Sequence, residues 1–214
     1  MNFTIDDMFR HSFVMAKDEK EYDRFCSRMK AQGFDMMPRV FYGNFPKCLV
    51  GDKGYRSKFV LCSLAHFFLV RMAKTLDLPH ITIFESDAYP MKECKEKLRI
   101  FLEGGVPDDS DELVFGNLHF IRNYNRFLKD AGNKFGRIKC NLWGAHSVVV
   151  FRKAYDQWLR AYLKCDWEIH ADFFNNLVDR CYATTRSFFI QVKDGLEYAK
   201  FMVDKNNLRD FPKI

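Results

Sequence analysis

Long uncharged runs are missing from this 214-residue sequence. The longest stretch worth testing as a membrane span, residues 59–70, has 12 residues and contains Ser63 and His66. A membrane-spanning helix needs about 20 apolar residues, so the sequence predicts no transmembrane segment. Residues 1–11 also lack the basic segment followed by an apolar one that marks a signal peptide. The expected location is cytoplasmic, since the scattered, unpaired cysteines are typical of a cytosolic protein.

Paired cysteines, internal repeats and low-complexity segments are missing as well. The seven cysteines are odd in number, widely scattered and never spaced Cys-x-x-Cys, which indicates reduced core residues. No segment has the composition of a linker. With 48% apolar residues and 23 phenylalanines, the chain has enough apolar material for a large core. We therefore expect a single domain that spans residues 1–214.

Positive charge is in modest excess, with 34 Lys and Arg residues against 28 Asp and Glu residues and a net charge of +6. Such a charge would suit anionic partners such as phosphates or an acidic membrane surface. An excess of this size is ordinary for a chain of this length, so it identifies no partner by itself. We expect no nucleic-acid partner.

Apolar residues alternate along the chain between strand-like and helix-like spacing. The predicted strands are short and apolar, at residues 11–16, 37–42, 81–84, 113–121 and 147–151. The predicted helices carry an apolar face, at residues 18–33, 57–76, 90–104, 155–162 and 174–181. Residues 123–139 are predicted to be a polar excursion. This alternation predicts an α/β fold, with an open mixed, mainly parallel sheet flanked by helices.

Two carboxylates follow the third predicted strand, in the sequence HITIFESDAYP. Side chains two apart on a strand share a face, so Glu85 and Asp87 can converge while Ser86 points away. Ligands of open α/β sheets bind outside the carboxyl ends of the strands, and hard cations such as Mg²⁺ and Mn²⁺ prefer oxygen ligands. Alternatively, Asp87 caps the next helix and Glu85 pairs with a surface lysine. These residues alone favour neither interpretation.

The segment VLCSLAHFFLVRMAKTLDLPHITIFESDAY resembles part of the family 25 glycosyltransferases, the lipopolysaccharide and collagen galactosyltransferase group. In that family a Cys-x-x-Ser-His helix leads to a strand ending in Glu-Asp-Asp. Cys62, His66 and Glu85 keep the family's spacing, whereas Ser86 stands at the position of its central Asp. Arg28-Met29 and the segment NLWGAHSVVVFRKAYDQWL are similar to two further family elements, in the same order along the chain.

The resemblance implies a GT-A fold and a hexosyltransferase that uses a nucleotide sugar, favouring a UDP-sugar, with Mn²⁺ or Mg²⁺. It implies that Glu85, Ser86, Asp87 and His146 bind this donor and its metal. Asp87 would contact the metal directly, and Glu85 would hold the ribose or bind the metal through water. His146 would bind the metal or the diphosphate, with a surface or turn histidine as the alternative.

An inverting transfer also needs a base for the acceptor hydroxyl. Asp172 resembles the family's Pro-x-Asp element, and Asp166 is the competing candidate. Either could instead be an acid at a helix start. The expected acceptor is a glycan or glycolipid in surface polysaccharide or lipopolysaccharide biosynthesis. The tail, residues 198–214, could contact the inner membrane surface, although a solvated helix is the favoured interpretation.

Three alternatives stay open at this point. Cys62 and His66 lie one helical turn apart and could form a metal pair, but a hydrogen-bonded histidine on a packed helix is favoured because only two ligands are visible. The whole protein could be a catalytically silent nucleotide-sugar-binding protein. A metal-dependent phosphodiesterase is less favoured, because such enzymes normally bring further acids or a lysine at short spacing.

Overall fold

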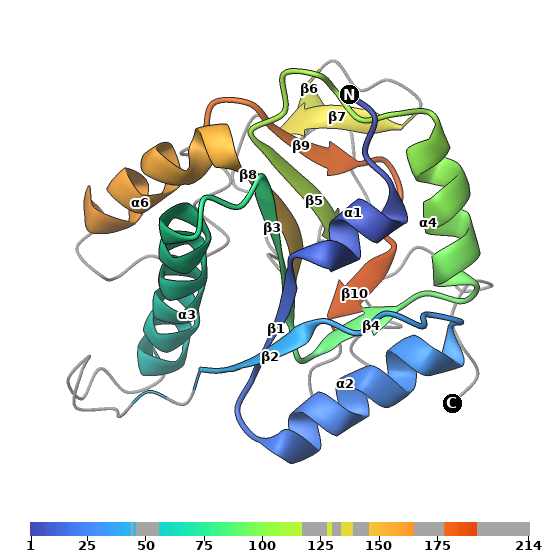
Figure 1. The fold of residues 1–214 in the computed structure, drawn as a ribbon, viewed down its shortest axis with the longest axis horizontal. Coiled ribbons are helices and arrows are strands. Elements are labelled where there is room, and N and C mark those ends of the chain that lie inside the picture. The colour runs from blue at the N-terminus through green and yellow to red at the C-terminus, as the bar shows by residue number, and fades with distance from the viewer. Residues whose placement is uncertain are drawn as a thin grey trace.

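A computed structural model describes residues 1–43, 45, 56–116, 128–129, 134–138, 146–164 and 178–191. A sheet of eight strands, in the order β2-β1-β3-β8-β5-β9-β7-β6, runs through the described chain (Figure 1). Its strands are β1 (Ser12–Ala16), β2 (Arg39–Tyr42), β3 (His80–Glu85), β5 (Glu112–Gly116), β6 (Leu128–Lys129), β7 (Phe135–Ile138), β8 (Ser147–Phe151) and β9 (Cys181–Thr184).

The strand directions make the sheet mixed but mainly parallel. β1 pairs in parallel with β2 and β3, and β5 pairs in parallel with β9. β8 lies antiparallel between β3 and β5, and β7 lies antiparallel between β9 and β6. All strands except β7 and β8 therefore run in one direction, which confirms the predicted sheet. A second, antiparallel pair is formed by β4 (Ala88–Pro90) and β10 (Phe189–Gln191).

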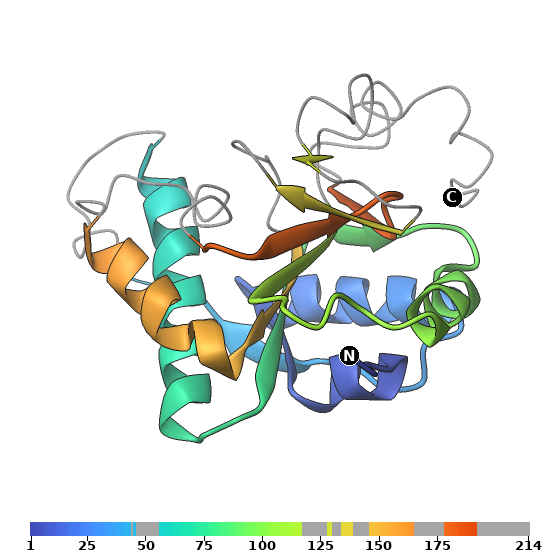
Figure 2. The ribbon, with the colours of Figure 1, turned by 90° about the horizontal axis from the view of Figure 1, so that it is seen from above.

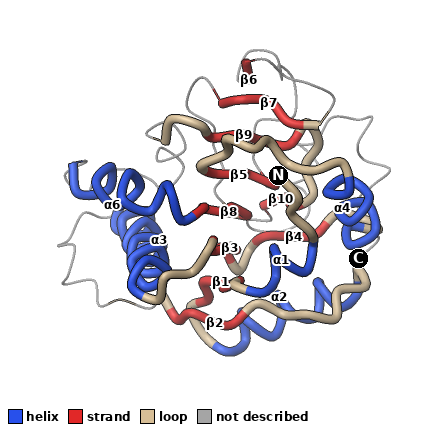
Figure 3. Tube along the Cα trace, turned by 45° about the horizontal axis from the view of Figure 1, so that its top comes forward, coloured by secondary structure: helices blue, strands red, loops and turns tan. Residues whose placement is uncertain are grey.

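Helices cover both faces of the sheet. α3 (Arg56–Thr75) and α6 (Tyr155–Lys164), which follows the short 3₁₀ helix η2 (Arg152–Ala154), pack on one face. α1 (Ile5–Arg10), α2 (Glu19–Ala31) and α4 (Cys94–Glu103) pack on the other. Figures 2 and 3 show these two groups on opposite sides of the strands. All residues of β1, β5 and β8 are buried, as expected for strands covered on both faces.

None of the described helices combines the length and the apolar character that a membrane span requires.

Local signals account for where α2 begins. The side chain of Asp18 accepts a hydrogen bond from the backbone N–H of Glu21 at 2.9 Å, which caps the helix. The carboxylate of Glu21 in turn accepts from the backbone N–H of Lys17 at 2.9 Å. Phe25 and Met29, one turn apart, then bury the apolar face of α2.

The predicted start of the helix at residues 90–104, which corresponds to α4, is wrong. Pro90 ends β4 and pairs with Phe189 of β10, and α4 begins only at Cys94. A proline has no backbone N–H, and strands at a sheet edge tolerate that loss. Helical spacing therefore identifies α4, whereas pairing with a segment distant in sequence determines where it begins.

Two further predictions near the C-terminal half are corrected. Cys181 does not end a helix but begins β9, where it pairs with Glu112. A short apolar pattern cannot distinguish a buried strand from a helix. Residues 123–139 include the strands β6 and β7, and the ring of Phe135 packs against Phe101 with centroids 5.0 Å apart. The start of the predicted helix before Val178 and the end of the predicted strand beyond Gly116 lie outside the described residues.

Candidate functional site at the carboxyl end of β3

The turn after β3 is held by both neighbouring strands. The backbone N–H of Glu85 donates to the carbonyl of His146 at 3.1 Å, just before β8. The backbone N–H of Ser86 donates to the carbonyl of Met15 in β1 at 3.0 Å. The tripeptide Glu85-Ser86-Asp87 therefore lies at the carboxyl edge of the sheet, between the parallel strand β1 and the antiparallel strand β8, in the kind of position where open α/β sheets bind ligands.

Glu85 and Asp87 converge on one amide group. The Nε2 atom of Gln191 donates to Oδ2 of Asp87 at 2.9 Å and lies 3.5 Å from Oε2 of Glu85. Gln191 is only 8% exposed and comes from β10, where it pairs with Ala88. The prediction that the two carboxylates share a side is confirmed. The sequence contains no signal for Gln191, because its place depends on pairing between segments about a hundred residues apart.

Ser86 points to the other side, as predicted. Its hydroxyl donates to Oε2 of Glu21 on α2 at 3.1 Å. Its backbone carbonyl accepts a hydrogen bond from the guanidinium of Arg28, whose Cζ atom lies 5.4 Å from the ring centroid of Tyr89. The middle residue of the tripeptide is thus attached to α2, and its role in donor binding stays a prediction.

A third side chain joins the pair Cys62 and His66. The thiol of Cys62 donates to Oε1 of Glu85 at 3.3 Å. His66 is fully buried, and its Nδ1 donates to the carbonyl of Cys62 at 3.0 Å and lies 3.8 Å from the sulfur. One ligand-type atom from each of the three residues lies within 4.8 Å of the others. The favoured prediction of a hydrogen-bonded histidine fits this geometry.

The same three donors could also hold a transition metal, because thiolate, imidazole and carboxylate are the ligands that Zn²⁺ accepts. The sequence showed only two of them. Glu85 comes from β3, and its approach to α3 follows from the packing of that helix on the sheet. Glu85 is therefore shared: one oxygen faces Cys62, and the other faces Gln191.

His146 is fully buried, which excludes the alternative of a surface histidine. Its Nε2 donates to the carbonyl of Phe189 at 3.1 Å. A Cβ atom at Gly116 would lie 2.5 Å from this nitrogen and 2.6 Å from the same carbonyl oxygen, so the glycine leaves space for the imidazole. The backbone of His146 adjoins Glu85, whereas its role as a metal or diphosphate ligand stays a prediction.

The two candidate bases, Asp166 and Asp172, lie outside the described residues, as does the tail 198–214. Their proposed roles therefore stay predictions.

No protein-family model and no curated protein sequence matches this chain. Several solved structures are similar to it in fold, among them the following three. The crystal structure of A197 from STIV aligns with a TM-score of 0.45 and 15% identity, over 83% of this chain and 81% of that one. A glycosyltransferase involved in the glycosylation of the major capsid of PBCV-1 aligns with a TM-score of 0.48 and 9% identity, over 89% and 97%.

The third is the nucleoside-diphosphate-sugar pyrophosphorylase from Vibrio cholerae RC9, with a TM-score of 0.40 and 12% identity, over 93% of this chain and 85% of that one. At these identities and TM-scores, the three likenesses identify no activity for this chain. Membership of family 25 stays a resemblance in sequence.

Proposed function

We propose that this protein is a metal-dependent glycosyltransferase that transfers a sugar from a nucleotide sugar, a UDP-sugar in the favoured case, to a glycan or glycolipid. The observation that carries the proposal is the convergence of Glu85 and Asp87 on Gln191 at the carboxyl end of β3. The resemblance of residues 60–89 to family 25 supports the same activity. This proposal has four finer parts. They are membership of family 25, a role in a surface-glycan pathway, inversion at the anomeric carbon, and a cytoplasmic location beside the inner membrane.

The residues at this edge fit a hard divalent cation such as Mn²⁺ or Mg²⁺. Gln191 places one electropositive N–H group between the two carboxylates, 2.9 Å from Asp87 and 3.5 Å from Glu85, so both acids present oxygen atoms toward one position. Asp87 would hold the cation, with Glu85 as a second oxygen donor and His146 as the proposed imidazole ligand. When bound, the cation would neutralise charge on the diphosphate leaving group.

Several described side chains at this edge of the sheet hold the two acids in place. Gln191 orients Asp87, and the thiol of Cys62 fixes one oxygen of Glu85. Arg28 holds the carbonyl of Ser86, which separates the two acids in the sequence. Ordered carboxylates lose less conformational freedom when a ligand binds. The proton of the acceptor hydroxyl would pass to Asp172, with Asp166 as the alternative base.

A calorimetric titration with UDP, with and without Mn²⁺, tests the proposal. We expect metal-linked UDP binding by the wild-type protein and by Asp35→Asn, a control that changes an exposed carboxylate elsewhere. Asp87→Asn should lose this binding while its melting temperature changes little. Wild-type protein that binds UDP no better with Mn²⁺ would remove the glycosyltransferase proposal. If Asp87→Asn unfolds or keeps its activity, Asp87 has a structural role.

A catalytically silent nucleotide-sugar-binding protein is the second candidate. The hydroxyl of Ser86, at the position of the family's central acid, faces Glu21 rather than the converging carboxylates. Metal-linked UDP binding without release of UDP from any UDP-sugar, in the presence of a panel of acceptor glycans, would favour this candidate over the enzyme.

A further inference from the structure

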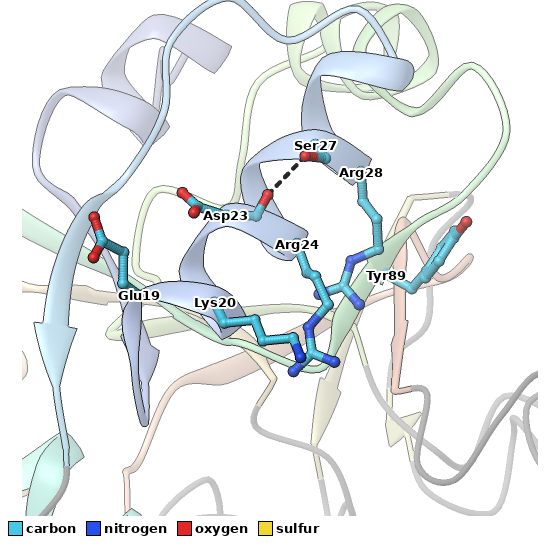
Figure 4. Close-up of a pocket in the computed structure, with 7 residues that line it drawn as sticks. All are labelled: Glu19, Lys20, Asp23, Arg24, Ser27, Arg28 and Tyr89. Atoms are coloured by element: carbon cyan, nitrogen blue, oxygen red, sulfur yellow. Dashed lines mark hydrogen bonds between the residues drawn. The ribbon is translucent and has the colours of Figure 1, made fainter.

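A second polar site lies on α2, close to the carboxylate edge but separate from it. We call it the α2 pocket, an open cavity of about 700 Å³. Its lining comes from one side of α2 and from β4, and consists of Glu19, Lys20, Asp23, Arg24, Ser27, Arg28 and Tyr89 (Figure 4). Tyr89 follows Asp87 by two residues, so the pocket adjoins the carboxyl edge of the sheet, where Glu85 and Asp87 lie.

Three cations form a row along this pocket. Lys20, Arg24 and Arg28 follow one another at intervals of four residues, which places them on one side of the helix. At 1.5 Å per residue the row covers roughly 12 Å of helix length. Figure 4 shows their charged ends gathered on the side toward Tyr89, whereas the carboxylates of Glu19 and Asp23 point away from that group.

Among the described residues no carboxylate pairs directly with this row, although Asp87 and Glu21 lie near enough to Arg28 to raise its pKa. Within the part of the chain that the structure describes, Lys20, Arg24 and Arg28 form no salt bridge. A cation one turn before the row behaves differently, because Lys17 pairs with both Asp18 and Glu21, at 3.9 and 3.7 Å. Like charges one turn apart on a helix repel each other. The three cations of the row have no ion pairs like those of Lys17 to reduce this repulsion among the described residues.

Arg28 connects the row to the carboxylate edge. Its guanidinium donates to the carbonyl of Ser86, while its Nε atom is buried with no acceptor among the described residues. Burial lowers the pKa of Arg28, Tyr89 and Asp87 partly offset this by raising it, and the charge of Arg24 lowers it. An anion in the pocket would relieve both lowering effects, since it would offer acceptors to the guanidinium groups and reduce their mutual repulsion.

We propose that the α2 pocket binds a phosphate-bearing small molecule, with Lys20, Arg24 and Arg28 as its ligands. Guanidinium groups present several N–H donors in a fixed plane, which suits the oxygens of phosphate groups, and lysine adds a point charge. A row of this length fits a diphosphate or a phosphorylated sugar better than a single monoanion. The acidic residues Glu19 and Asp23 on the lining disfavour an extended anionic surface such as a membrane. The site needs no metal and does not depend on the glycosyltransferase proposal.

The test is a calorimetric titration with inorganic pyrophosphate at low salt in the presence of EDTA, which removes metal-linked binding at the carboxylate edge. We expect wild-type protein to bind, with an affinity that decreases as NaCl is added. Arg24→Gln should weaken binding about tenfold, because it removes a charge-assisted hydrogen bond. Lys20→Gln should weaken it to a smaller extent. Lys30→Gln is the matched control, an exposed lysine on the same helix outside the pocket.

Asp87→Asn separates this proposal from the proposed function. It should keep pyrophosphate binding in EDTA even where it loses metal-linked UDP binding. Arg28 is left unchanged in this test because it also holds Ser86. The proposal is overturned if wild-type protein does not bind pyrophosphate, or if Lys30→Gln weakens binding as much as Arg24→Gln, since the attraction would then be diffuse. Binding to phosphatidylserine vesicles without binding to pyrophosphate would overturn it in favour of a membrane contact.

Discussion

Two acidic pairs lie at opposite edges of the sheet, and their surroundings differ. At the carboxyl edge, Glu85 and Asp87 face the amide of Gln191 and the thiol of Cys62. At the amino edge, where β5 begins, Asp111 and Glu112 meet other partners. Both pairs adjoin a strand, although Glu85 and Asp87 are two residues apart at the end of β3 and Asp111 and Glu112 are adjacent at the start of β5. Only their partners distinguish a structural pair from a candidate ligand site.

At the amino edge, neighbouring cations neutralise the charge of one acid, and burial keeps the other acid protonated. The carboxylate of Asp111 accepts two hydrogen bonds of 3.1 Å from Arg180 and lies 3.6 Å from the ammonium of Lys153. Glu112 is fully buried, accepts from the indole N–H of Trp158 at 2.9 Å, and has a pKa raised to about 8 by its burial. Glu112 is thus mostly protonated at pH 7, so this edge has little use for an added cation.

The largest effect on stability is expected from Glu112→Gln. Burial raises the pKa of Glu112 in the folded protein from its ordinary value of 4.5 to about 8. Its protonated form is therefore favoured by folding, and this contribution is full below about pH 4.5 and lost as the pH rises through 8. Glutamine is neutral and can still accept from Trp158. Urea unfolding should show Glu112→Gln more stable than wild type by on the order of 4 kcal/mol at pH 8.

Near pH 4 the same substitution should change the free energy of unfolding little. Glu19→Gln, which changes an exposed glutamate, serves as the control at both pH values. A stability difference that does not depend on pH would mean that Glu112 is not the buried acid of the amino edge.

Gly116→Ala tests how tightly the carboxyl edge is packed. The new methyl group would lie 2.5 Å from Nε2 of His146 and 2.6 Å from the carbonyl oxygen of Phe189. Because one of these atoms belongs to the backbone, the substitution should destabilise the fold by about 1–3 kcal/mol. Thermal unfolding measures the effect, with Gly43→Ala as the control, where the new atom would meet Ala65 at 3.4 Å and no other described residue. Equal effects of the two variants would contradict the packing described around His146.

A pair of matched variants tests the difference between the amino edge and the carboxyl edge. Asp111→Asn removes the charge that Arg180 and Lys153 share, and we expect a loss of about 1–2 kcal/mol, since both cations are partly exposed. Asp87→Asn keeps an acceptor for Gln191 and should change stability by less than Asp111→Asn does. Chemical denaturation of both proteins decides the order. The reverse order would assign the structural role to the carboxyl edge.

Ser86→Asp gives the smallest expected effect and introduces the acid that family 25, which this segment resembles in sequence, has at this position. The new carboxylate would face Glu21, whose oxygen now accepts from the serine hydroxyl at 3.1 Å. Like charges at that distance should destabilise the protein by about 1 kcal/mol, more than Ser86→Ala does. Melting temperatures of the two variants make the comparison. A Ser86→Asp protein that is more stable than Ser86→Ala would show that the side chain turns toward the carboxylate edge.

Much of the fold follows from short-range patterns in the sequence. Predicted strands at 11–16, 81–84 and 147–151 correspond to β1, β3 and β8, because buried strands are short apolar runs. The helices α2, α3 and α6 were recognisable from their apolar spacing. The errors at Pro90 and Cys181 have one cause, since both residues lie in strands whose partners are far away in the sequence.

The sequence predicted that Glu85 and Asp87 share one side of the chain and that Ser86 faces the other; the structure has this arrangement, but through the turn that follows β3, because the strand ends at Glu85. Only the tertiary structure decided what meets them: Gln191, brought to Asp87 by the β4–β10 pairing, and Cys62, brought to Glu85 by α3. Periodicity is a local property of the backbone. The partners of a side chain depend on which distant segments pack together, and no local pattern specifies that.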